Sequence, residues 1–161
     1  MIIRSESFLP ARNYAVHEAA HYLVGVAFGF PMDCPQVFRD GSGGIAPFDR
    51  TVLKHDPDID LSGLPGDEMK QAALRIAAMF LAGCAAEAIA ADVDCSCIVG
   101  GRTSDLRLAV QCIRDSGQSD LLLQDAWRLA VKMLRHAWPL VESIAQDIPV
   151  TDGTHRPVKF H

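Results

Sequence analysis

Two histidines and a glutamate lie close together in the segment VHEAAHYLV, residues 16–24. His17 and His21 are four residues apart, so on a helix their imidazoles lie on one face and can bind the same metal ion. Glu18 follows the first histidine, which brings its carboxylate within reach of a metal-activated water. The spacing therefore predicts a zinc site with His17 and His21 as ligands and Glu18 as general base. The alternative is an amphipathic helix that carries two imidazoles by coincidence.

A catalytic zinc ion needs a third protein ligand and one open position. That ligand has to come from another part of the chain, and spacing alone does not select it. Asp105 has a second explanation, since an acidic residue in a first helical turn interacts favourably with the helix dipole. Glu87 lies in an alanine-rich stretch, where burying an acid is costly without a partner. The candidates by residue type are His55, Glu87, Asp92, Asp94, Asp105 and His136.

The elements around these residues predict a mainly helical α+β domain with a small β-hairpin. The first helix is expected to start near Pro10, with Ser7 as its cap, and to end near Gly29. Two short apolar runs around an Asp-Gly turn predict the hairpin within residues 34–48, and a polar loop follows at 50–65. Further helices are expected at about 67–91, 104–115, 120–136 and 139–147. The stretch DVDCSCIVGGRTSD, residues 92–105, is expected to be a loop that can contain a brief strand, and the tail at 148–161 is expected to be loosely ordered.

Length and composition favour a single domain over the whole of residues 1–161, and the cysteines described below favour a cytoplasmic location. The net charge of -5 and the lack of a basic run argue against nucleic acid as a partner. The longest apolar stretch, residues 76–91, is interrupted by Glu87 and is short for a membrane span. Five cysteines without a secretory signal indicate free thiols, and the CxC pair Cys95 and Cys97 is a weak metal or redox signal. Trp127 and Trp138 are expected in the core or at a subunit contact.

Three segments follow one another in a suggestive order: YAVHEAAHYLV, LAGCAAEAI and GGRTSDLRLAVQCIRD. In order and approximate spacing they resemble the FtsH-type ATP-dependent zinc metallopeptidases, whose segments read HEAGH, GGRAAEE, and Ser or Asn before Asp-Leu. The resemblance covers about residues 12–135 and implies a helical, zincin-like peptidase domain. It also implies that Asp105 is the third zinc ligand and that Glu87 at most orients a ligand imidazole.

The chain also departs from that family. Ala20 replaces a glycine, Cys84 stands where arginine is common, and no GxxxxGK[ST] phosphate loop or membrane segment is present. The resemblance therefore implies a free-standing peptidase domain whose polypeptide substrates are flexible or are presented by a separate ATPase, and it is compatible with a homo-oligomer. A substrate can add alongside the hairpin, or the hairpin can simply cover the helix. Two alternatives are a non-catalytic zinc-binding adaptor and a regulatory protease for one dedicated partner.

Overall fold

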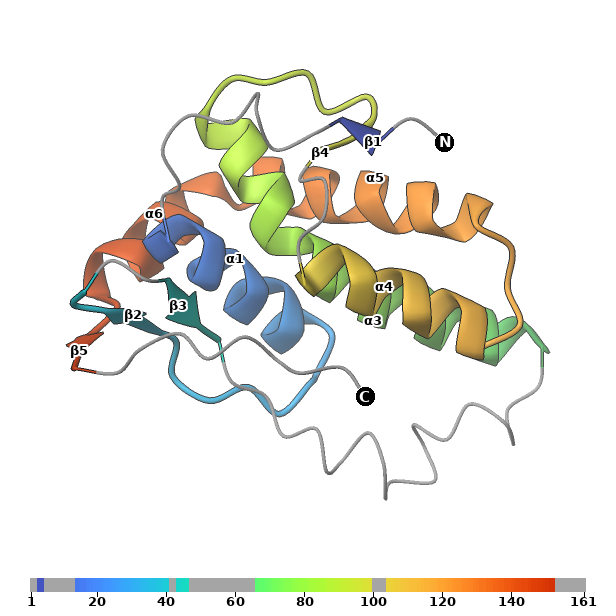
Figure 1. The fold of residues 1–161 in the computed structure, drawn as a ribbon, viewed down its shortest axis with the longest axis horizontal. Helices are drawn as coiled ribbons and strands as arrows, with labels where there is room; N and C mark the ends of the chain where they lie inside the picture. Colours follow the sequence, from blue (N-terminus) through green and yellow to red (C-terminus); the bar gives the residue numbers. More distant parts are fainter. Residues whose placement is uncertain (1–2, 5–13, 41–42, 47–65, 100–103, 153–161) are drawn as a thin grey trace.

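The computed structural model describes residues 3–4, 14–40, 43–46, 66–99 and 104–152. Within these ranges the protein is mainly helical, as predicted, and the small β element is also present (Figure 1). The helices are α1 (Tyr14–Ala27), α3 (Gly66–Ala90), α4 (Ser104–Asp115), α5 (Leu121–His136) and α6 (Trp138–Asp147). The strands are β1 (Ile3–Arg4), β2 (Gln36–Phe38), β3 (Gly44–Ile45), β4 (Ile98–Val99) and β5 (Val150–Thr151).

The long helix α3 forms the centre of the molecule and packs against α1, α4 and α5 (Figure 1). Half of its buried residues are alanine, so neighbouring helices can approach closely. By length and composition α3 is the one described helix that could cross a membrane, yet 78% of its apolar window is buried inside the protein. A central helix enclosed by other helices has the same composition, and the packing supports that interpretation.

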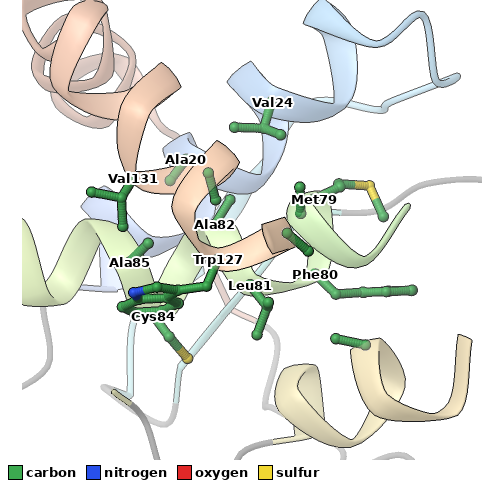
Figure 2. Packing of buried hydrophobic residues seen from close by; sticks show 14 of the residues in the cluster. Ala20, Val24, Met79, Phe80, Leu81, Ala82, Cys84, Ala85, Trp127 and Val131 are labelled. Carbon is green, nitrogen blue, oxygen red and sulfur yellow. The ribbon is translucent and has the colours of Figure 1, made fainter. Parts of the chain in front are cut away.

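Trp127 of α5 fills the space beside α3 and is fully buried (Figure 2). Its indole Nε1–H donates a hydrogen bond to the backbone oxygen of Cys95, at 2.8 Å, so the one polar atom of this large side chain is satisfied. The expected core position of Trp127 is therefore confirmed. Trp138, at the start of α6, is partly buried against the same core.

The ends of the helices agree with the predicted ones within about two residues. The first helix ends at Ala27, two residues before the expected Gly29, which adopts a left-handed conformation with φ +79°. The amide of Phe30 then donates to the backbone oxygen of Gly25, at 2.9 Å, so a glycine-terminated turn closes the helix. The expected helix start near Pro10, its cap Ser7, and the loop at 50–65 with His55 all lie outside the described residues.

The hairpin is confirmed, because β2 and β3 pair antiparallel, with its turn residues 41–42 outside the described ranges. The expectation of a loosely ordered tail from residue 148 is wrong for its first residues. The strand β5 pairs parallel with β2, and the amides of Val37 and Arg39 donate to the backbone oxygens of Pro149 and Thr151, at 3.1 and 2.8 Å. This pairing joins distant parts of the chain, so the local pattern of the tail could not indicate it. The loop expected at 92–105 contains a brief strand, β4, which pairs parallel with β1.

Candidate metal centre

Two imidazoles on α1 are buried against α3, with His17 5% and His21 8% exposed. The Nδ1 atom of His17 lies 2.7 Å from Oε1 of Glu87, and the Nδ1 atom of His21 lies 2.8 Å from the backbone oxygen of Met79. A carboxylate and a carbonyl oxygen accept hydrogen bonds, so both Nδ1 atoms are assigned as donors. In the neutral imidazoles, each Nε2 atom therefore carries a lone pair.

These two Nε2 atoms meet each other and a carboxylate oxygen at one point. They are 3.0 Å apart, and Oδ2 of Asp105 lies 3.0 Å from the Nε2 of His17 and 3.4 Å from that of His21. Three acceptors at such distances repel one another unless a cation lies among them. A tetrahedral zinc ion with bonds of about 2.0–2.1 Å separates its ligand atoms by roughly 3.3 Å, so this triangle fits zinc.

The pKa values of His17, His21 and Asp105 also indicate that this cluster needs positive charge. Burial opposes a charge on His17, but its hydrogen bonds to Asp105 and Glu87 outweigh burial and raise its pKa to about 10. Burial likewise opposes a charge on His21, and the Asp105 carboxylate raises the pKa of His21 above its ordinary value. The two imidazoles in turn hold the pKa of Asp105 well below its usual range, against the effect of burial. Without a metal ion, protons supply the positive charge of the cluster.

Gly83 of α3 leaves the space that the His17 ring occupies. A Cβ atom at this position would overlap the Nε2, Cε1 and Cδ2 atoms of His17. A glycine inside a helix is less favourable than alanine by about 1 kcal/mol, so its presence here has a packing reason. The pairing of His17 with Glu87, one helical turn further along α3, depends on this close approach.

Glu18 lies next to the cluster and is 6% exposed. Its negative charge contributes to raising the pKa values of both His17 and His21. On its other side it lies directly against Gly44 of β3. Glu18 thus joins the helix that carries both imidazoles to the hairpin.

Only some of the candidate metal ligands identified from the sequence lie close together in the structure. Among the described residues, His17, His21 and Asp105 form the one group with metal-ligating geometry, and Glu87 adjoins it through His17. The other described candidates, and the CxC pair, lie outside this group. Asp94 bonds to the amide and hydroxyl of Ser96, Asp92 lies in a left-handed turn after α3, His136 ends α5, and Cys95 donates to the backbone oxygen of Val93.

Two contributors were not predicted from the sequence, namely the backbone oxygen of Met79 and the absent side chain of Gly83. A carbonyl group carries no residue-type signal, whereas a glycine within an alanine-rich helix is a visible one. Comparisons with models of protein families, with curated proteins and with solved structures each found no match. The interpretation of the cluster therefore depends on its own chemistry.

Proposed function

We propose that this chain is a zinc-dependent metallopeptidase with a helical, zincin-like fold of the FtsH type. In this proposal His17, His21 and Asp105 hold the zinc ion, and Glu18 is the general base. One observation carries it: the Nε2 atoms of two buried imidazoles and an oxygen of the partly buried Asp105 converge at 3.0–3.4 Å, while the other nitrogen of each imidazole is bound as a donor. Positive charge has to complete this arrangement, and a metal ion bound by all three atoms supplies it in place of protons.

The donor set favours zinc over the harder divalent cations. Two imidazole nitrogens and one carboxylate suit zinc, whereas calcium and magnesium prefer shells made of oxygen. Three protein ligands leave a fourth position open, which distinguishes a catalytic zinc site from a structural one. Glu87 and the backbone oxygen of Met79 each hold one imidazole in its ligand orientation, and such partners also increase ligand basicity.

A bound zinc ion would supply Lewis-acid chemistry, which polarises a peptide carbonyl and lowers the pKa of water. Glu18 accepts a proton in this chemistry and returns one to the leaving amine. A substrate chain in extended form can add along β3, whose one pairing among the described residues is with β2. The substrates are flexible polypeptides, or polypeptides presented by a separate ATPase or a dedicated partner.

The first experiment measures zinc in the purified protein by elemental analysis, and about one zinc per chain is expected. The second compares cleavage of unstructured casein by the wild type and by Glu18→Gln. The variant should retain its zinc and lose activity by about 10²–10⁴-fold, because the base is removed while the ligands stay. Absence of zinc uptake near neutral pH would refute the metal centre. A zinc-loaded wild type that cleaves no polypeptide, casein or partner, would instead indicate an adaptor.

A further inference from the structure

The strand β3 lies on the side chain of Glu18 with nothing between them. Gly44, the first residue of β3, is buried, and a Cβ atom there would lie 2.6 Å from Cγ and 3.1 Å from Oε1 of Glu18. The same Cβ would lie 2.8 Å from the backbone oxygen of Gln36 in β2. Separations below about 3 Å between such atoms are not tolerated in packed proteins. The strand can occupy this position only because residue 44 has no side chain.

The hairpin cannot easily move away to make room. The obstructing oxygen of Gln36 belongs to the backbone, and β2 and β3 move together because they are paired. In addition, β2 is held on its far side by β5, through the amides of Val37 and Arg39. A side chain at position 44 would therefore act mainly on Glu18, whose Cγ is the nearest atom.

We propose that Gly44 is a positioning residue that sets the place of the Glu18 carboxylate relative to the imidazoles of His17 and His21. This inference depends on the proposed peptidase function, in which Glu18 is the base. Gly44 forms no part of the ligand set, so it acts on the position of the base and leaves the metal in place. A displacement of about 1 Å in a reacting group lowers rates by about 10²-fold.

The test compares Gly44→Ala with Gly66→Ala in the full chain. A Cβ atom at Gly66, the first residue of α3, meets nothing within 4 Å, so this variant is a matched control. Zinc content, kcat and KM for casein-derived peptides are measured on both. Gly44→Ala should keep one zinc per chain and lose about 10²-fold in kcat, with the larger part of the effect in kcat rather than KM. Gly66→Ala should behave as the wild type.

A double-mutant cycle based on Tm values tests the contact between Gly44 and Glu18 independently of activity. The Tm is measured for the wild type, Gly44→Ala, Glu18→Ala and the double variant. The loss of Tm caused by Gly44→Ala should be about 2–4 °C larger when Glu18 is present than when it has been replaced by alanine. Equal losses in both backgrounds would overturn the inference.

The activity data separate failure of this inference from failure of the proposed function. An active wild type whose Gly44→Ala variant keeps full kcat would overturn the positioning role alone. A zinc-loaded wild type without peptidase activity would overturn the catalytic role of Glu18 and, with it, this role of Gly44.

Discussion

Gly83→Ala tests the metal centre from a residue that is not a ligand. The added Cβ overlaps three atoms of the His17 ring, so His17 has to leave its position or α1 has to move away from α3. Either response breaks the contact of the His17 Nδ1 atom with Glu87, at 2.7 Å, and moves its Nε2 atom away from Asp105. The zinc site should therefore lose a ligand although every ligand residue is still present.

The expected change in unfolding free energy for Gly83→Ala is the balance of two opposed effects. Alanine stabilises a helix interior by about 1 kcal/mol relative to glycine. Breaking a buried ion pair costs about 3–5 kcal/mol, because the carboxylate of Glu87 stays buried without its partner. The net loss in unfolding free energy is thus about 2–4 kcal/mol, or a decrease in Tm of roughly 5–15 °C for a domain of this size. Zinc affinity should fall by at least about 100-fold, the upper end of the loss expected when a hydrogen-bond partner of a ligating histidine is removed.

The assay combines a zinc titration against a competing chelator with thermal unfolding of the chelated protein. Gly66→Ala is the control, since its Cβ meets no atom. The chelated protein is included because it separates the packing effect from the stabilisation that bound zinc provides. Zinc affinity within about three-fold of the wild type, with unchanged Tm, would show that the His17 ring does not occupy the space beside Gly83 and would refute the geometry of the site.

Two further predictions concern the ligand set and its protons. Asp105→Ala should weaken zinc binding far more than Glu87→Ala, which should lower zinc affinity by about 10–100-fold. Both variants are measured in a chelator titration, and equal zinc retention by the two would contradict the assignment of Asp105 as a ligand. The pKa of His17 is raised from 6.5 to about 10 in the zinc-free fold, so its contribution to stability is complete below pH 6.5 and is lost as the pH rises to 10. In zinc-loaded protein the Nε2 atom of His17 carries no proton, so the Tm of the zinc-loaded protein does not depend on this titration. The difference in Tm between zinc-loaded and chelated protein should therefore widen between pH 6.5 and 10, and a constant difference would contradict the assignment of His17 as a ligand.

The sequence predicted the parts of the site that depend on local geometry. The period of the helix places His17 and His21 on one face whatever surrounds them, and the cost of burying Glu87 pointed to a partner, which is His17. Asp105 is different, because it lies 88 residues from His17 and reaches it only through the packing of α4 against α3. Residue types and spacing left six candidates for the third metal ligand. The resemblance to the peptidase family selected Asp105, and the structure places Asp105 beside the two histidines.

Other features could not be predicted because they depend on backbone atoms or on distant pairing. The partner of the His21 Nδ1 atom is the carbonyl oxygen of Met79, and any residue at position 79 would supply the same atom. The strand β5 pairs with the edge of β2 opposite β3, and the sequence of the tail contains no sign of that pairing. Gly44 looks like a turn residue beside Gly43, whereas its role becomes visible only when Glu18 is seen against it.

The alanine-rich composition of α3 also follows from the requirements of the cluster. The Nδ1 atoms of His17 and His21 reach Glu87 and the Met79 backbone oxygen at 2.7 and 2.8 Å, which requires the two helices to lie close together. Larger side chains along α3 would increase this separation and take the Nδ1 donors of both buried imidazoles away from their acceptors, at a cost of about 1–3 kcal/mol for each donor. Small residues in α3 thus keep the two imidazoles in the orientation in which their Nε2 atoms face Asp105. The helix that forms the centre of the core is therefore also the support of the candidate metal centre, and substitutions that enlarge its α1-facing side chains should weaken zinc binding before they unfold the protein.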